Sequence, residues 1–233
     1  TGNRMEFIGR NGTLERPAAL AAGAKLSGRT GAGLDPCGAL QTSVVLAAHS
    51  SVELVWLLGE AGTTQAAQAL IARWRGEDVD VALQSVRADW SAMLDTATVR
   101  TPDRAFDLML NGWLLYQVLA CRVWARSAFY QSSGAYGFRD QLQDTMALIL
   151  AQPALAREHL LRAAGRQFLE GDVQHWWLPQ TGRGVRTRVS DDRVWLGYCV
   201  AHYVETTADA GVLDEMVPFL DGPALQSNET DNF

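Results

Sequence analysis

The spacing of apolar residues divides the chain into two parts. In residues 1–62, short apolar runs alternate with glycine-bearing turns, and residues 41–48 and 52–58 have the length and the β-branched content of strands. We expect these two runs to pair as a hairpin, and residues 6–9 to belong to a strand and turn. From residue 63 onward, apolar residues recur every three or four positions, which is the period of amphipathic helices.

This second pattern predicts a series of helices. Thr101-Pro102-Asp103 indicates a helix start with a capping residue and a proline at the first helical position, and the apolar residues from Phe106 to Trp124 form a face wide enough for a buried helix. Because strands and helices do not alternate, a Rossmann or TIM-barrel fold is not expected, and paired helices in a toroid or bundle are. The predicted helices cover residues 63–74, 79–94, a segment from 101, about 140–151, 153–169 and 191–207, and the second of them links two domains.

Composition narrows the class of protein. The chain has 233 residues and a net charge of −6, which argues against a nucleic-acid binder, because such proteins need a surplus of basic residues on one face. Its three cysteines, Cys37, Cys121 and Cys199, show no CxxC spacing, so neither a disulfide framework nor a zinc site is indicated, and a reducing compartment fits best. No apolar run approaches the roughly twenty residues that span a bilayer. Both ends resemble interior sequence, and we interpret the chain as a piece of a longer protein.

The histidines give no sign of a metal site. The four of them are far apart in the sequence and none has the spacing of a ligand pair. One of them follows an acid on an arginine-rich helix, as Glu158-His159, and we interpret that pair as solvent-facing.

Residues 124–144 combine arginines, carboxylates, an amide and tyrosines around a glycine-bearing loop. An acid at a helix start, such as Asp140 or Asp144, is explained by ordinary capping, but capping does not explain the density of the whole group. Sugars need this mixture, because carboxylates and amides bind hydroxyls and aromatic rings cover the apolar face of a pyranose. The group consists of Arg126, Tyr130, Tyr136, Arg139, Asp140, Gln143 and Asp144.

Residues 170–195 are predicted to be a long loop between two helices, rich in tryptophan and arginine. A loop of this length in a globular domain is usually functional. His175 and Trp176 are its candidate ligand contacts, although a lone histidine is more often structural and paired tryptophans are more often core. Arg183, Arg186 and Arg188 either bind phosphate or sugar, or form a solvated face, or pair with Asp191 and Asp192.

Three motifs carry a family resemblance. They are Gly-Phe-Arg-Asp-Gln-Leu-Gln-Asp at residues 137–144, Gly-Asp-Val-Gln-His-Trp-Trp at 171–177, and the glycine-rich opening at residues 6–12 and 26–37. Together they resemble the inverting phosphorylases of glycoside hydrolase family 94, nearest to the carboxy-terminal region of cyclic β-1,2-glucan synthases. The resemblance implies a mainly α fold with a β portion. Residues 1–62 would be the end of a β-sandwich, 63–100 a helical linker, and 101–233 the first part of an (α/α)₆ toroid.

The resemblance also implies a reaction and a site. Inorganic phosphate attacks the anomeric carbon of a β-glucoside and α-glucose 1-phosphate is released, with phosphate as co-substrate and no other cofactor. Asp140 matches a carboxylate that holds sugar hydroxyls, and Arg126 matches a phosphate contact. No general acid is recognised within the chain, so we expect it downstream of Phe233. The predicted sugar contacts are Arg139, Asp140, Gln143, Asp144, His175, Trp176, Asp191 and Asp192.

Two other functions stay open at this point. One is a non-catalytic module that binds glucan or senses its chain length and has no acid. The other is an inverting hydrolase on the same toroid, with Glu170, Asp172 or the Asp191-Asp192 pair as base. The expected partners are a β-glucan oligosaccharide and phosphate. No contact with nucleic acid or with a membrane is expected from this segment. A homodimer is left open as its oligomeric state. The resemblance implies a cytoplasmic location, including the cytoplasmic side of an inner membrane as part of a larger protein.

Overall fold

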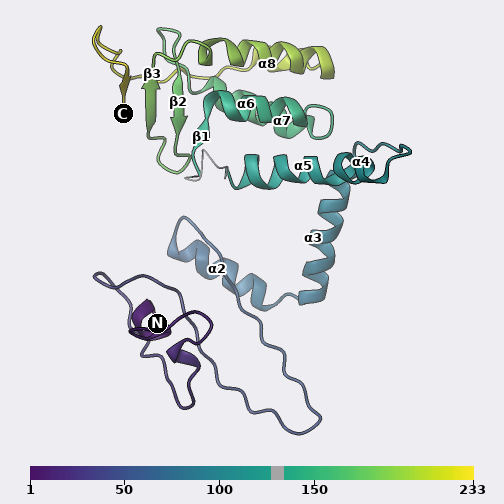
Figure 1. Ribbon diagram of the computed structural model, residues 1–233. Coiled ribbons are helices and arrows are strands. Elements are labelled where there is room, and N and C mark those ends of the chain that lie inside the picture. Colours follow the sequence, from purple (N-terminus) through teal and green to yellow (C-terminus); the bar gives the residue numbers. More distant parts are fainter. Residues whose placement is uncertain (127–133) are drawn as a thin grey trace. The chain divides into compact units, whose positions relative to one another are not determined.

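The computed structural model describes residues 1–126 and 134–233, which form two units, Thr1–Gly76 and Glu77–Phe233 (Figure 1). The first unit contains two α-helices, α1 (Arg4–Ile8) and α2 (Thr64–Arg75), and a 3₁₀ turn, η1 (Ala18–Leu20). Thr63 begins α2 by accepting a hydrogen bond from the backbone N–H of Ala66, as an N-cap does.

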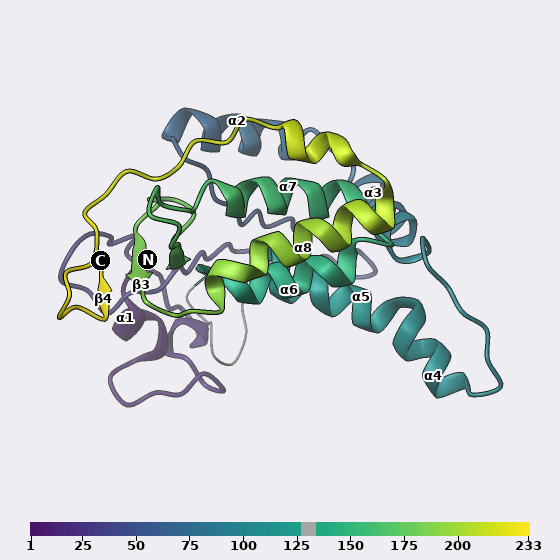
Figure 2. The ribbon, with the colours of Figure 1, turned by 90° about the horizontal axis from the view of Figure 1, so that it is seen from above.

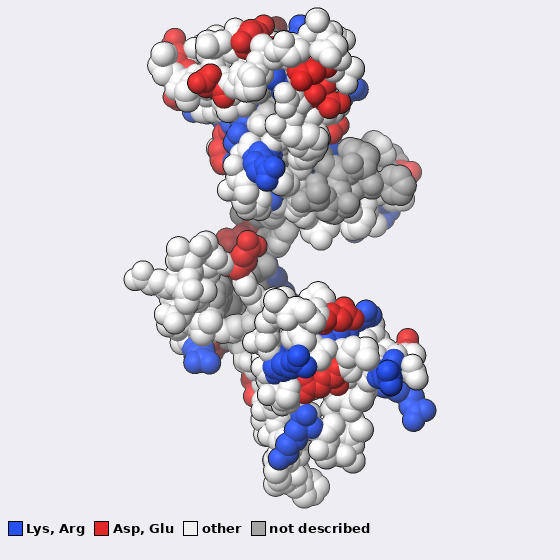
Figure 3. Space-filling view, turned by 90° about the vertical axis from the view of Figure 1, so that its left-hand side faces the viewer, with Lys and Arg blue, Asp and Glu red and all other residues white. Residues whose placement is uncertain are grey.

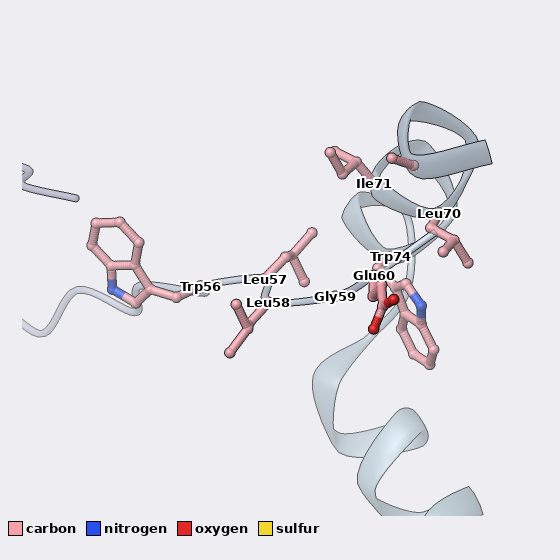
Figure 4. A pocket seen from close by; sticks show the side chains of 9 residues that line it. Trp56, Leu57, Leu58, Gly59, Glu60, Leu70, Ile71 and Trp74 are labelled. Carbon is pink, nitrogen blue, oxygen red and sulfur yellow. The ribbon is translucent and has the colours of Figure 1, made fainter. Parts of the chain in front are cut away.

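The hairpin predicted in the first unit is absent from the described residues. Residues 41–48 and 52–58 form no strand, and residues 6–8 lie in helix α1 instead of the predicted strand. An extended run becomes a strand only when a neighbour accepts and donates its backbone hydrogen bonds. Along this run the large side chains of Val45 and Leu58 are 94% and 104% exposed. Nearby, residues 56–60 and α2 line an apolar pocket of about 400 Å³, in which Glu60 is the one charged lining residue (Figure 4).

The second unit begins with α3 (Val79–Leu94), which Asp78 caps, and continues into a helical run over residues 104–124. That run consists of α4 (Arg104–Leu108), the π-helical turn η2 (Met109–Trp113), α5 (Leu114–Tyr116) and the π-helical turn η3 (Gln117–Trp124). Its N-cap is Asp103, so Pro102 precedes the cap and is not the first helical residue. The predicted buried face is also wrong for the part of the chain described, since Phe106, Trp113 and Trp124 are 44–52% exposed.

Three helices form the core of the second unit. They are α6 (Phe138–Leu148), α7 (Pro153–Ala164) and α8 (Asp192–Thr207), close to the predicted segments, and they pack against one another (Figure 2). Proline at the first position of α7 is favourable because its missing N–H needs no partner there. The buried cluster consists of Tyr136, Phe138, Leu142, Ile149, Ala156, Leu160, Ala163, Val173, Trp177, Leu196, Cys199, Tyr203 and Val212.

A small antiparallel sheet lies at one end of these helices and replaces the predicted long loop (Figure 1). Its strands, in order across the sheet, are β1 (Tyr136–Gly137), β2 (Gln174–Trp177), β3 (Gly184–Thr187) and β4 (Asp231–Asn232). Gly184 is required where β2 and β3 meet, because a Cβ atom there would collide with the carbonyl oxygen of Trp176. Strands of two to four residues carry too little periodicity to be read from sequence.

Arg186 on β3 is the centre of a buried ionic network. Its side chain is 5% exposed, and it donates two hydrogen bonds to Asp172, at 2.6 and 2.7 Å, and one to Glu170 at 2.9 Å. It also donates to the carbonyl oxygens of Gly222 and Pro223 and lies 3.9 Å from the ring centroid of Phe168. The predicted pairing of this arginine with Asp191 or Asp192 is therefore wrong. Arg186 instead joins strand β3 to Glu170 and Asp172 before β2 and to Gly222 and Pro223 near the end of the chain.

The arginine two positions further on has a similar role at the surface. Arg188 donates to the carbonyl oxygens of Leu225, Gln226 and Glu229, so it fastens the last segment of the chain to β3. Arg183 is exposed. On the face that Figure 3 presents, acidic side chains are interspersed with basic ones, as expected for a chain with a modest net charge of −6.

Candidate functional site

The candidate site forms where the beginnings of α6 and α8 meet strand β2. Phe138, the first residue of α6, is fully buried and anchors the helix start, while Arg139 and Asp140 follow on its outer side. The side chain of Gln141 accepts a hydrogen bond from the backbone N–H of Gly137, which satisfies one donor at this helix start. The turn from β1 into α6 is thus fixed by a buried ring and an internal hydrogen bond, and it presents Arg139 and Asp140 beside the sheet.

Two polar pairs connect α6 and β2 to the start of α8. Arg139 Nη1 donates to Asp191 Oδ2 at 2.8 Å, and the same guanidinium lies 5.5 Å from the ring centroid of Trp195. His175 Nδ1 lies 2.6 Å from Asp192 Oδ2. Three regions far apart in the sequence therefore supply one cluster.

The carboxylates of this cluster differ in exposure. The Asp192 side chain is 1% exposed and lies behind His175, whose own side chain is 42% exposed. Asp140 is partly buried and has no hydrogen-bond partner among the residues the structure describes, so its carboxylate is available to a ligand. The hydrogen bond to Asp192 raises the pKa of His175, and the negative charges of Asp192, Asp140 and Asp191 add to this effect against the opposing effect of burial.

The predicted residues further along α6 are placed differently. Asp144, one turn after Asp140, accepts a hydrogen bond from Arg122 Nε at 2.9 Å, and both side chains are largely buried. Burial raises the pKa of Asp144, an effect that Arg122 partly offsets and that the charge of Asp140 reinforces. Gln143 is exposed on the helix surface. Asp144 is thus already held by an arginine, whereas Asp140 is not.

Arg126, the predicted phosphate contact, is held by backbone oxygens and an aromatic ring. Its Nε donates to the carbonyl oxygen of Gly134 at 2.6 Å and its Nη1 to that of Trp124 at 3.0 Å. Its guanidinium lies 4.8 Å from the ring centroid of Tyr136. Within the described ranges no carboxylate pairs with Arg126, so its charge remains available for an anion. Tyr130, which we grouped with it, lies outside the described residues.

The two adjacent tryptophans have different roles. Trp177 is fully buried and stacks on Tyr136 with 5.4 Å between ring centroids, so the core interpretation holds for it. Trp176 is partly exposed and meets the ring of Phe233 edge to face at 5.8 Å. Sequence reasoning missed Trp195 as a member of the site, although its place one helical turn after Asp191 puts both on one face of α8.

The proposed bases of a hydrolase are engaged elsewhere. Glu170 and Asp172 both bind Arg186, and the pKa of Asp172 is lowered because this arginine outweighs the raising effect of burial. Among the residues described, no group of three or more histidine, cysteine, aspartate or glutamate side chains is arranged to hold a metal ion. No helix in the described ranges is long and apolar enough to cross a bilayer.

His159 is buried, contrary to the prediction that it faces solvent. It is 3% exposed, with its ring 5.4 Å from that of Tyr136 and its Nδ1 3.4 Å from Arg162 Nη1. Burial, aided by the charge of Arg162, lowers the pKa of His159 to about 3. Only Glu158, which pairs with Arg162, follows the prediction and is exposed.

This burial predicts sensitivity to acid. A histidine with a lowered folded-state pKa takes up its proton more readily when unfolded, so its contribution to stability is complete above about pH 6.5 and declines as the pH falls toward 3. We expect the free energy of unfolding to fall by about 3 kcal/mol between pH 7 and pH 4 from this group alone. Urea titrations at several pH values measure it. His159→Gln should flatten the slope, and equal slopes in the variant and the unaltered protein would contradict the assignment.

Two family models match this chain, one in its first part and one in its second. Residues 89–228 match the family model described as the glycosyl hydrolase 94 superfamily, catalytic domain, and residues 1–77 match the glycosyl hydrolase 94 supersandwich domain. These matches confirm the predicted fold class, in which a supersandwich portion precedes a mainly helical catalytic domain.

Several characterised proteins are similar to this chain. It is 48% identical over its whole length to the cyclic β-(1,2)-glucan synthase NdvB of Rhizobium meliloti, of which it covers 8%. It is 27% identical to the N,N'-diacetylchitobiose phosphorylase of Vibrio furnissii over 95% of this chain and 31% of that protein. It is 28% identical to the 1,2-β-oligoglucan phosphorylase of Listeria innocua over 47% of this chain and 10% of that protein. The chain thus spans less than a third of each of these relatives.

Proposed function

Because the chain belongs to glycosyl hydrolase family 94, we propose that it is part of a carbohydrate-active enzyme that acts on β-1,2-glucans. The reaction would be that of an inverting glycoside phosphorylase, or of the phosphorylase-like domain of a cyclic β-1,2-glucan synthase. Similarity to a cyclic β-(1,2)-glucan synthase and to a 1,2-β-oligoglucan phosphorylase supports the choice of linkage. In this proposal residues 1–62 end a β-sandwich, 63–100 form the helical linker, and 101–233 begin the toroid.

The observation that carries the proposal is the free carboxylate of Asp140 beside the polar pairs of α8. A glucosyl unit offers adjacent hydroxyls that both donate and accept hydrogen bonds, and a carboxylate next to an imidazole can bind two of them. The partly exposed ring of Trp176 offers an apolar surface of the kind that packs on a pyranose. Arg139 and Asp191 neutralise each other and form a polar rim that adds no net charge.

The phosphate would be bound by Arg126. Its guanidinium is held in place by two carbonyl oxygens and pairs with no carboxylate of the described chain, so it can attract an anion and donate to its oxygens. In the reaction, a phosphate oxygen forms a bond to the anomeric carbon as the bond from that carbon to the bridging oxygen breaks. A proton from an acid supplied beyond Phe233 goes to the leaving oxygen, and α-glucose 1-phosphate results. Phosphate is then a co-substrate, and no further cofactor is invoked.

The free thiols and the need for phosphate support a cytoplasmic location. Cys37, Cys121 and Cys199 are all free thiols, which supports a reducing compartment such as the cytoplasm, and a phosphorylase needs a supply of inorganic phosphate. We therefore place the enzyme in the cytoplasm or on the cytoplasmic side of an inner membrane.

The test is the release of glucose 1-phosphate by the full-length protein. We expect release from β-1,2-linked gluco-oligosaccharides when phosphate is present, no release when phosphate is omitted, and at most weak release from the β-1,4-linked cello-oligosaccharides used as matched controls. Release of glucose that does not depend on phosphate would contradict phosphorolysis and favour hydrolysis. Saturable binding of the oligosaccharide with no turnover would contradict an enzyme and favour a glucan-binding module.

A further inference from the structure

His175 and Asp192 form a close pair in which only the histidine can reach a ligand. Asp192 Oδ2 lies 2.6 Å from His175 Nδ1, the Asp192 side chain is 1% exposed, and its second carboxylate oxygen is buried with no hydrogen-bond partner in the described chain. A carboxylate so deeply buried cannot itself meet a ligand. Among the described residues the imidazole is the one polar contact of this carboxylate, so its effect on a bound sugar has to pass through His175.

This contact fixes which nitrogen of His175 faces the ligand. Nδ1 is occupied by Asp192, and Nε2 lies on the other side of the imidazole ring; the His175 side chain as a whole is 42% exposed. An ionised aspartate only accepts hydrogen bonds, so the proton of this contact belongs to the histidine. The neutral imidazole is therefore the Nδ1–H tautomer with a lone pair at Nε2, and the protonated ring offers an Nε2–H donor.

We propose that Asp192 is a positioning residue that holds His175 so that its Nε2–H donates to a hydroxyl of the glucosyl unit bound by Asp140. This inference rests on the proposed function and assigns the two residues different roles: His175 contacts the sugar, and Asp192 acts only through His175. The carboxylate of Asp140 would accept from the neighbouring hydroxyl, so one acceptor and one donor face adjacent groups of the same ring.

The charged groups around His175 favour its protonated form. The carboxylate of Asp192 at the start of α8, that of Asp140 on α6 and that of Asp191 just before α8 all stabilise the imidazolium. Arg139 on α6 opposes them weakly, because Asp191 neutralises it. On the adjacent strand β3, Arg186 is neutralised by its own acidic partners. Burial of the ring is the remaining opposing effect, and the hydrogen bond to Asp192 exceeds it.

The pair can be tested without any ligand. In ¹⁵N NMR spectra of the protein with labelled histidine, assigned with His175→Gln, neutral His175 should be the Nδ1–H tautomer. Asp192→Asn should lower its pKa, because an opposite charge at hydrogen-bond distance is removed. The matched control Asp191→Asn, whose carboxylate binds Arg139 instead, should lower the pKa much less. An Nε2–H tautomer in the unaltered protein would overturn the assignment even if the Asp192 variant failed to fold.

The role in sugar binding needs a second readout. Calorimetric titration with a β-1,2-linked glucose trimer should show affinity that declines as the pH rises through the pKa of His175 measured by NMR. Asp192→Asn should weaken binding about tenfold at neutral pH and move this decline to lower pH. Asp192→Glu should restore part of the lost affinity. His175→Gln should bind the trimer with no such pH dependence. A decline that stays at the same pH in Asp192→Asn would overturn the positioning role. Absence of trimer binding in every variant, with the tautomer as expected, would instead overturn the proposed function.

Discussion

Replacing Arg186 by methionine is expected to lower the free energy of unfolding by about 3–5 kcal/mol. The substitution leaves Asp172, whose side chain is 9% exposed, as a buried carboxylate without its cationic partner, and it removes the guanidinium that spans Glu170 and the carbonyl oxygens of Gly222 and Pro223. Removing one partner of a buried pair costs more than the pair contributes, because the remaining charge is desolvated and unpaired. Urea titration followed by circular dichroism gives the change directly.

Two further variants test whether the loss of stability comes from the buried charge. Arg188→Met removes an arginine two residues further along the chain, just past the end of β3, and because its contacts are exposed backbone carbonyls, we expect a loss of about 1 kcal/mol or less. In the double variant Arg186→Met with Asp172→Leu, no buried charge is left alone, and much of the lost stability should return. Equal losses for Arg186→Met and Arg188→Met would show that the buried network contributes nothing beyond surface contacts.

Asp140→Asn is expected to reduce the kcat/KM of the full-length enzyme for β-1,2-gluco-oligosaccharides by about 10- to 100-fold. The amide is nearly isosteric, but it replaces a charged acceptor by a neutral group, and hydrogen bonds to charged groups contribute about 1.5–3 kcal/mol each. Since Asp140 has no partner among the described residues, its loss should affect the substrate and leave the fold unchanged. Initial rates of glucose 1-phosphate release, together with the urea midpoint of the variant, separate the two effects.

The matched control for Asp140→Asn is the same chemical change on α7. Glu158→Gln alters a carboxylate that is 61% exposed and bound to Arg162 on its own helix, so kcat/KM should remain within twofold of the unaltered enzyme. If Asp140→Asn also remained within twofold, Asp140 would not be a sugar contact and the site proposed around it would be wrong. If its urea midpoint fell along with its activity, the loss would reflect folding and not recognition.

The helices were predictable because each carries its own signal. The segments 64–75, 79–94 and 153–164 carry apolar residues at helical spacing and begin with a capping side chain or proline, which are local properties of the chain. The hairpin expected from residues 41–58 failed because a strand depends on a partner, and the described residues supply none. The sheet was missed for the opposite reason, since its short strands are defined by pairing across the sequence.

For the site, the sequence by itself determined the residue types and their clustering. It indicated a sugar-binding mixture around residues 124–144 and 170–195 and, through its motifs, the family to which the chain belongs. Only the tertiary structure decided what each residue does. It separated the free carboxylate of Asp140 from Asp144, which Arg122 holds, and it put Asp192 behind His175. Burial and hydrogen-bond partners arise when distant segments meet, so no local pattern of residues could have distinguished these acids.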